Sequence, residues 1–199
     1  MSVRRRRAVV LSSLLVPAAL GLRGFPAAAA QPPTPACGDD GGAPTPSETE
    51  GPYFKPRSPA RASLLEPGLA GPRMVLVGRV LSTSCRPIAG ALLDFWHADP
   101  SGAYDNEGYR CRGHQLTGAE GSYRLATVVP GIYPGRTRHI HVRLQAWGAP
   151  PLTTQLYFPG EPHNQADALF RKELLVATTA GETGDGRLAR SDFVLSPRG

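Results

Sequence analysis

The sequence predicts an all-β domain, an antiparallel β-sandwich with long loops and at most one short helix. Three observations favour this class. The 199 residues include 21 Pro and 23 Gly but only 7% aromatic residues, which is typical of a domain with many turns. Short apolar stretches are separated by turn residues along most of the chain. The clearest stretch, residues 139–146, alternates polar and apolar side chains with the period of a strand.

Taken in order, the apolar and β-branched stretches predict the strands of this sandwich. They are residues 74–81, 90–96, 122–128, 139–146, 153–158 and 192–195, the last at a sheet edge. The first two flank a turn and are expected to pair as a hairpin. Residues 99 to about 118 are expected to form a long loop. Residues 164–171 predict a short helix with Asn164 as its N-cap.

The strand at residues 139–146 carries the strongest functional pattern. Its polar face consists of His139, His141, Arg143 and Gln145, and its apolar face of Ile140, Val142, Leu144 and Ala146. Residues two apart rise by about 6.5–7 Å along a strand, so both imidazoles point the same way and can share one ion. Packing of the apolar face on a core sets the register and thereby aims His139 and His141.

The other donors near this strand indicate which metal it would bind. Tyr133 lies in the turn before the strand and Tyr104 in an earlier loop, whereas the cysteines or glutamate typical of zinc sites are missing nearby. Phenolate is a hard anionic oxygen donor, and together with imidazole it suits a ferric ion better than zinc or copper(I). The pattern therefore favours iron.

The net charge of +6 comes mostly from the first 30 residues. They hold five arginines and no acid, and without those five the 22 basic residues fall to 17 against 16 acidic residues. No basic patch then remains to indicate a nucleic-acid partner. The arginines at 4–7, the apolar run 8–22 and the alanines at 27–30 have the order of an export signal.

This leader predicts an exported protein, secreted or periplasmic. Its apolar run is too short to span a bilayer comfortably, so no stable membrane insertion is expected after processing. Arg6 and Arg7 resemble a twin-arginine signal, a route that would suit a protein exported with its iron in place. Residues 31–48, rich in Pro and Gly, predict a disordered linker, and residues 49–199 the folded β-sandwich domain.

Three cysteines follow the leader. Cys85 and Cys111 both fall in the expected folded domain, so they are the expected disulfide pair outside the cell. Cys37 would then be left over.

Five segments carry a resemblance to a known family. They are TEGPYF at 49–54, DFWHA at 94–98 with the loop to Tyr104, PGIYP at 130–134, RTRHIH at 136–141 and TQLYF at 154–158. In this order they resemble the intradiol ring-cleavage dioxygenases, which open catechols between the two hydroxyl-bearing carbons. Any one segment is a weak match, whereas five in order are specific. The resemblance covers about residues 49–170 and implies a transthyretin-like sandwich of the exported, stand-alone branch.

The resemblance also implies a ligand set and a mechanism. A non-haem Fe(III) ion would be bound by Tyr104, Tyr133, His139 and His141. Catechol and dioxygen would yield a cis,cis-muconate-type diacid, with Tyr133 leaving the iron and taking a catechol proton. Arg136 would stabilise negative charge that develops on the substrate, and Gln155 would orient the substrate. Tyr53 is expected to line the substrate pocket.

One departure from the family concerns substrate choice. Arg138 stands where related enzymes usually have a small residue, and it could bind a substrate carboxylate or face solvent. The resemblance therefore leaves the particular catechol open, and it also leaves the choice between monomer and homo-oligomer open. His97, His114 and His163 lie in or beside loops and are expected to be solvated.

Two other functions compete with the dioxygenase. A zinc hydrolase would use His139 and His141 with a carboxylate that completes the site. An exported β-sandwich that only binds a partner would hold no metal and turn over no catechol. Metal analysis separates these hypotheses, because iron bound by tyrosinate is coloured and zinc is colourless.

Overall fold

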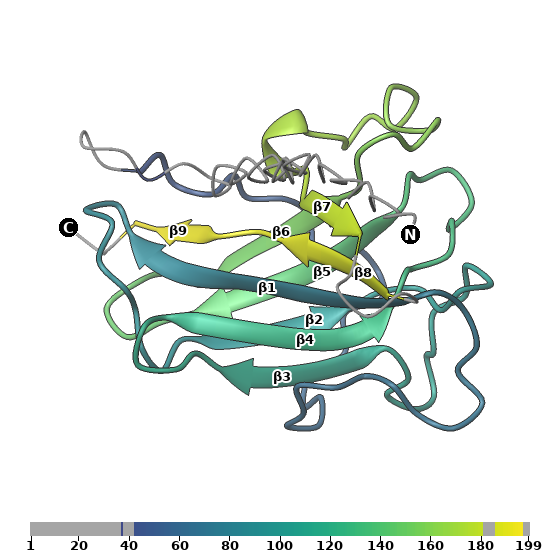
Figure 1. The fold of residues 1–199 in the computed structure, drawn as a ribbon, viewed down its shortest axis with the longest axis horizontal. Coiled ribbons are helices and arrows are strands. Elements are labelled where there is room, and N and C mark those ends of the chain that lie inside the picture. Colours follow the sequence, from purple (N-terminus) through teal and green to yellow (C-terminus); the bar gives the residue numbers. More distant parts are fainter. Residues whose placement is uncertain (1–36, 38–41, 181–185, 197–199) are drawn as a thin grey trace, which may run out of the picture. The chain divides into compact units, whose positions relative to one another are not determined.

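The computed structural model describes residue 37 and residues 42–180 and 186–196, which form a β-sandwich of two sheets (Figure 1). One sheet has the strand order β4-β1-β8-β7 with β9 also paired to β1, and the other has the order β3-β2-β5-β6. The elements are β1 (Arg73–Ser82), β2 (Leu92–Trp96), β3 (Arg112–Leu116), β4 (Ser122–Val128), β5 (His139–Gln145), β6 (Leu152–Tyr157), the 3-10 turn η1 (Lys172–Leu174), β7 (Ala177–Ala180), β8 (Gly186–Arg190) and β9 (Phe193–Leu195). Residues 1–30, the expected export signal, lie outside the described residues.

The predicted all-β sandwich is confirmed, and its core lies between the two sheets. Neighbouring strands are antiparallel except that β8 and β9 run parallel to β1. The alternation predicted for β5 is also confirmed, since Ile140, Val142 and Leu144 are all fully buried in the core. Full burial of one such side chain stabilises the fold by about 1.5–3 kcal/mol, which is enough to hold the register of β5.

The expected hairpin between the first two strands is wrong. β1 pairs with β4, β8 and β9, whereas β2 pairs with β3 and β5 in the other sheet. Leu76 of β1 and Leu93 of β2 are both fully buried in one core cluster, so the two strands cover each other across the sandwich. Periodicity alone does not distinguish this arrangement from pairing side by side. β3 lies within the stretch that the sequence predicts as a long loop.

Residues 164–171 form turns, and the helix expected there is wrong. The Asn164 side chain caps no helix. Its Nδ2 donates to Phe158 O at 2.9 Å, and its Oδ1 accepts from Thr137 Oγ1 at 2.7 Å. Side-chain bonds of this kind compete with helix formation by giving the backbone another set of partners. Within the described ranges, no helix is long and apolar enough to cross a membrane.

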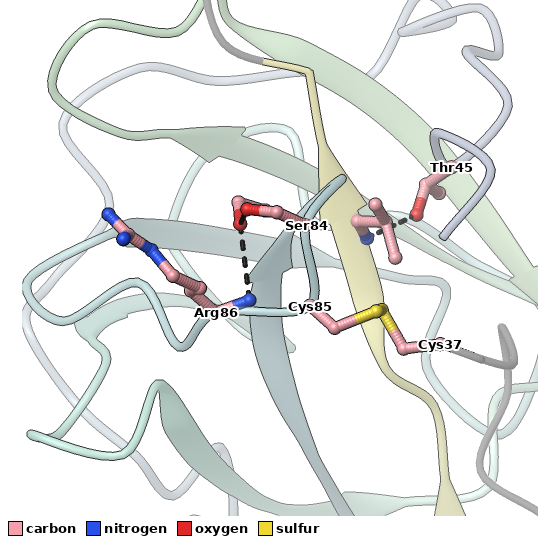
Figure 2. Close-up of a disulfide and its surroundings, with 7 residues drawn as sticks. Cys37, Thr45, Ser84, Cys85 and Arg86 are labelled. Atoms are coloured by element: carbon pink, nitrogen blue, oxygen red, sulfur yellow. Dashed lines mark hydrogen bonds between the residues drawn. A yellow bond between two sulfur atoms is a disulfide. The ribbon is translucent and has the colours of Figure 1, made fainter. Parts of the chain in front are cut away.

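The disulfide joins Cys37 to Cys85, so the expected pairing of Cys85 with Cys111 is wrong (Figure 2). Cys85 lies in the turn after β1, where the segment before the sandwich reaches it. Cys111 is a free thiol directly before β3 and is 1% exposed. The pattern of cysteines in the sequence could not identify the pair, because the segment containing Cys37 was taken to be disordered.

The segment expected to be a disordered linker is attached to the sandwich where the structure describes it. Thr45 exchanges two hydrogen bonds with Val194 of β9, one through its backbone N–H at 2.9 Å and one through its hydroxyl at 2.8 Å. Thr154 Oγ1 donates to Pro46 O at 2.8 Å, and Glu48 N donates to Thr153 O at 2.8 Å. These bonds bring residues 49–54 to the polar face of β5.

Candidate active site

The polar face of β5 forms the base of the site. His139 and His141 are 4% and 3% exposed, so loops cover this face. The register places Gln155 of β6 and Trp96 of β2 on either side of His141. The Trp96 ring stacks on the His141 ring with centroids 4.8 Å apart. Because Trp96 covers a face of the His141 ring, the ring nitrogens at its edge remain available to bind an ion together with other donors.

Four predicted metal ligands come together above this face. The Nε2 atoms of His139 and His141 lie 3.1 Å apart, and Tyr104 Oη lies 3.1 Å from His139 Nε2. The Tyr133 ring is edge-on to the Tyr104 ring, with centroids 5.7 Å apart. Three donor atoms therefore converge on one point, with a second phenol beside them.

The spacing and tautomers of this cluster fit a bound metal ion. Two nitrogens bound to one ion at about 2.0–2.1 Å, roughly at a right angle, stand about 3 Å apart. His139 Nδ1–H donates to Thr137 O at 2.7 Å, which leaves its Nε2 unprotonated and able to bind metal. His141 Nδ1 is buried without a hydrogen-bond partner among the described residues. The other ring nitrogen of His141, Nε2, is the one that faces His139 Nε2.

The electrostatics of the cluster also suit a cation. Burial lowers the pKa of His139 to about 4 and the pKa of His141 well below its usual value. Both imidazoles are therefore neutral at pH 7, which is the form that binds metal. Burial raises the pKa of Tyr104, although Arg136 and Arg112 act in the opposite direction. A metal ion at the phenol oxygen would favour the phenolate.

The loops that carry Tyr104 and Tyr133 are held together by their backbones. Gly131 N donates to Asp99 O at 2.9 Å. A Cβ at Gly131 would lie 2.3 Å from Gly102 N, so a side chain at this position would push the two loops apart. The two tyrosines are thereby placed relative to each other before either one meets the histidines.

Tyr53, predicted to line the substrate pocket, covers both of these tyrosines. Its ring stacks on the Tyr104 ring with centroids 4.4 Å apart, and its hydroxyl lies 2.6 Å from Tyr133 Oη. Tyr53 is half-buried, so it stands between the cluster and solvent. The 49–54 segment therefore forms one wall of the site.

Arg136 lies beside the cluster in a network of hydrogen bonds. Its Nε donates to Asp167 Oδ2 at 2.9 Å, and its Nη2 donates to Gln155 Oε1 at 2.7 Å. Gln155 Nε2 donates to Thr49 O at 3.0 Å, which fixes the orientation of the amide. The guanidinium is therefore held by a carboxylate and by the amide of Gln155.

Comparison with known proteins identifies the family. A family model described as Dioxygenase matches residues 49–197. The chain belongs to the intradiol ring-cleavage dioxygenase family. The dioxygenase domain of a dioxygenase carbohydrate-binding protein fusion from the cellulolytic bacterium Streptomyces sp. SirexAA-E is 55% identical, with a TM-score of 0.75 over 78% of this chain and 100% of that one. The 3-chlorocatechol 1,2-dioxygenase from Rhodococcus opacus 1CP is 27% identical, with a TM-score of 0.73 over 77% of this chain and 73% of that one.

This intradiol family member matches only part of the length of its curated relatives. The protocatechuate 3,4-dioxygenase beta chain of Burkholderia cepacia is 30% identical over 154 residues, and the match covers 65% of this chain and 66% of the relative. Across the first relatives the match spans between 50% and 66% of their length.

Several residues around the intradiol site differ from their sequence-based expectations. The expectation that His97 is solvated is wrong. His97 is 1% exposed, and its ring makes hydrogen bonds with Ala98 O and Thr127 Oγ1. Arg138 pairs with Glu161 at 2.9 Å and donates to Pro130 O, so it does not simply face solvent.

Sequence reasoning missed Asp167 and the role of Trp96. Asp167 holds Arg136, but it lies in the stretch that was expected to be a helix. Trp96 had no predicted role in the site, although its place opposite His141 follows once β2 and β5 are known to pair. That pairing was the signal that could have found it.

The zinc alternative finds no support in this intradiol site. Among the residues that the structure describes, no three His, Cys, Asp or Glu side chains are grouped so that they could hold a metal ion. Within those described residues, no carboxylate is grouped with His139 and His141 as a zinc hydrolase would need.

Proposed function

We propose that this chain is a non-haem iron(III) dioxygenase that cleaves catechols between the two hydroxyl-bearing carbons to give cis,cis-muconate-type diacids. The observation that carries the proposal is the convergence of Tyr104 Oη with the Nε2 atoms of His139 and His141, next to Tyr133. Imidazole and phenolate together form a donor set that suits Fe(III). The names of its relatives, which include chlorocatechol, protocatechuate and hydroxyquinol dioxygenases, support the same activity.

The iron would be held by Tyr104, Tyr133, His139 and His141. When bound, it would supply Lewis-acid chemistry that makes the catechol ring reactive toward dioxygen. Two anionic ligands lower its charge of +3 to near +1, which matches a catechol that binds as a dianion.

The protein's own groups would handle protons and developing charge. Tyr133 is the group that accepts a catechol proton, and Tyr53 Oη at 2.6 Å is placed to hold its hydroxyl by a hydrogen bond. Arg136 would stabilise negative charge that develops on the substrate, while Asp167 and Gln155 keep its guanidinium from reorienting. Gln155 thus orients the substrate indirectly, through Arg136 and the 49–54 segment.

The substrate would be a catechol without a carboxylate. Recognition of a carboxylate requires a cation that is not already paired. Arg138, the candidate for that role, is paired with Glu161, and Arg136 is paired with Asp167. A catechol whose other ring substituents are uncharged avoids competition with these ion pairs.

Oxygen uptake with a panel of catechols, followed by product identification, tests the proposal. We expect about one iron per chain, a broad visible absorption band, and ring-opened diacids. His139→Ala and His141→Ala should lose both iron and colour. A colourless protein with bound zinc, or one with neither metal nor turnover, would favour the hydrolase or the binding module instead.

We further propose that the protein is exported and that residues 1–30 are removed. The leader pattern carries this proposal. The Cys37–Cys85 disulfide supports it, because such bonds persist in oxidising compartments.

A further inference from the structure

Arg112 is a buried arginine without a carboxylate partner. Its side chain is 2% exposed, and among the described residues no Asp or Glu oxygen lies within ion-pair distance of its guanidinium. Burial of an unpaired cation is unfavourable unless its N–H groups are well used. The partners of this guanidinium therefore indicate what it does.

The hydrogen bonds of Arg112 end on two backbone carbonyls beside the metal cluster. Nε and Nη2 both donate to Asp105 O, at 3.1 and 3.0 Å, and Nη1 donates to Tyr53 O at 2.5 Å. Asp105 directly follows Tyr104, and Tyr53 stacks on Tyr104 and bonds Tyr133. The planar guanidinium of Arg112 thus connects Tyr53, in the wall of the site, to the loop that carries Tyr104.

The backbone of Arg112 belongs to the same row of the sheet as His141. Arg112 of β3 pairs with Trp96 of β2, and Trp96 pairs with His141 of β5. Cys111, directly before Arg112, has a φ of 54°, an unfavourable conformation for a residue with a side chain. Such strain persists where the surroundings hold the chain firmly. The guanidinium is therefore anchored to a rigid row and reaches out to two loops.

We propose that Arg112 is a positioning residue, whose guanidinium holds the Tyr53 wall and the Tyr104 loop at a fixed distance from His141. The arginine fork is required, because a lysine ammonium is a point charge and cannot bind both carbonyls with the same planar geometry. Removal of Arg112 lets the two loops separate from the sheet, so Tyr104 and Tyr53 lose their alignment.

Hydrogen exchange of the metal-free protein tests this without reference to catalysis. Arg112→Met should exchange faster in residues 49–56 and 99–110 and be unchanged in β5. The matched control is Lys55→Met, because Lys55 Nζ donates to Glu107 O and Gly108 O and joins the same two segments at their exposed end. The control should change exchange near residues 107–108 and leave Tyr104 protected.

The metal-loaded protein provides a second readout, which rests on the proposed function. Arg112→Met should keep most of its iron, shift the visible band and raise KM for catechol about tenfold with a smaller change in kcat. Arg112→Lys keeps the charge and should recover part of the stability but not the position of the band. If Arg112→Met loosens both sheets equally, or leaves the band and KM unchanged, Arg112 is only a core residue. If the parent protein turns over no catechol, the exchange experiment still decides the role of Arg112.

Discussion

The Arg136 guanidinium is held on two sides and binds no metal. Asp167 and Gln155 fix it at 2.9 and 2.7 Å, and the side chain of Asp167 is itself buried. A donor that is fixed before the reaction stabilises developing charge without reorganisation. His139 and His141 have the complementary role, since burial keeps them neutral and their Nε2 atoms face each other. Under the proposed function, metal binding and charge stabilisation would therefore belong to different residues and would be separable by mutation.

Arg136→Ala should keep its iron and its colour but lose most of its activity toward every catechol. Removal of one preorganised donor reduces turnover by about a hundred- to a thousandfold, or about 2.7–4 kcal/mol. Arg136→Lys should recover little, because an ammonium does not reproduce the planar fork. Iron content measured beside oxygen uptake checks this. Arg138→Ala is the control, since Arg138 pairs with Glu161 outside the network of Arg136. Near-normal turnover in Arg136→Ala would remove the arginine from the mechanism.

His97 should make the stability of the protein depend on pH. Burial lowers its pKa to about 4, and the neutral ring satisfies both neighbours, since Nδ1–H donates to Ala98 O and Nε2 accepts from Thr127 Oγ1. Between about pH 4 and the ordinary value of about 6.5 the unfolded state binds more protons, so stability is full above this range and falls as pH is lowered through it.

Urea unfolding of the metal-free protein at several pH values measures the effect. The contribution of His97 should be about 2–3 kcal/mol between pH 6.5 and pH 4. His97→Gln should have a shallower slope than the parent protein over this range. Equal slopes in the two proteins would contradict the assignment.

At the scale of elements, the sequence predicts best where a local pattern decides the structure. β5 was predicted because polar and apolar residues alternate along it. In the structure its apolar side chains are buried in the core between the sheets, and its histidines lie on the opposite face of the strand. β3 (Arg112–Leu116) has no such pattern, and its strand conformation depends on pairing with β2. The helix expected at residues 164–171 failed because Asn164 and Asp167 bind distant groups. The four expected ligands were found together, whereas Asp167 could not be found without knowing what Arg136 touches.

The Cys37–Cys85 disulfide should affect stability far more than catalysis. It closes a loop across a sequence separation of 48, and loss of such a bond typically destabilises a domain by about 2–4 kcal/mol. Between Cys37 and the wall of the site, however, Thr45 and Pro46 are bonded to β9 and β6. We expect Cys37→Ser to lower the melting temperature and leave KM for catechol within about twofold. The control is Cys111→Ser, which removes the free thiol. A large rise in KM would show that the disulfide positions the wall directly.

At the scale of the whole molecule, the charges and the cysteines both support the proposal that the protein is exported. The basic excess is confined to the first 30 residues, and the remaining 17 basic and 16 acidic residues nearly balance. Within the described part, acidic and basic side chains pair around the site, as in Arg143–Glu50 and Arg171–Glu48. A leader followed by a nearly neutral, disulfide-containing domain is the pattern expected of a protein that works outside the cytoplasm.

The mature protein should therefore begin after residue 30. The order of arginines, apolar run and alanines in the leader predicts cleavage beyond the alanines at 27–30. Amino-terminal sequencing and the intact mass of exported material check the cleavage site. Replacement of Arg6 and Arg7 by lysine should block export if the twin-arginine route is used, whereas lysine at positions 4 and 5 is the matched control for charge. Recovery of a chain that begins at Met1 or Ser2 from the membrane fraction would instead show that the leader is retained as an anchor.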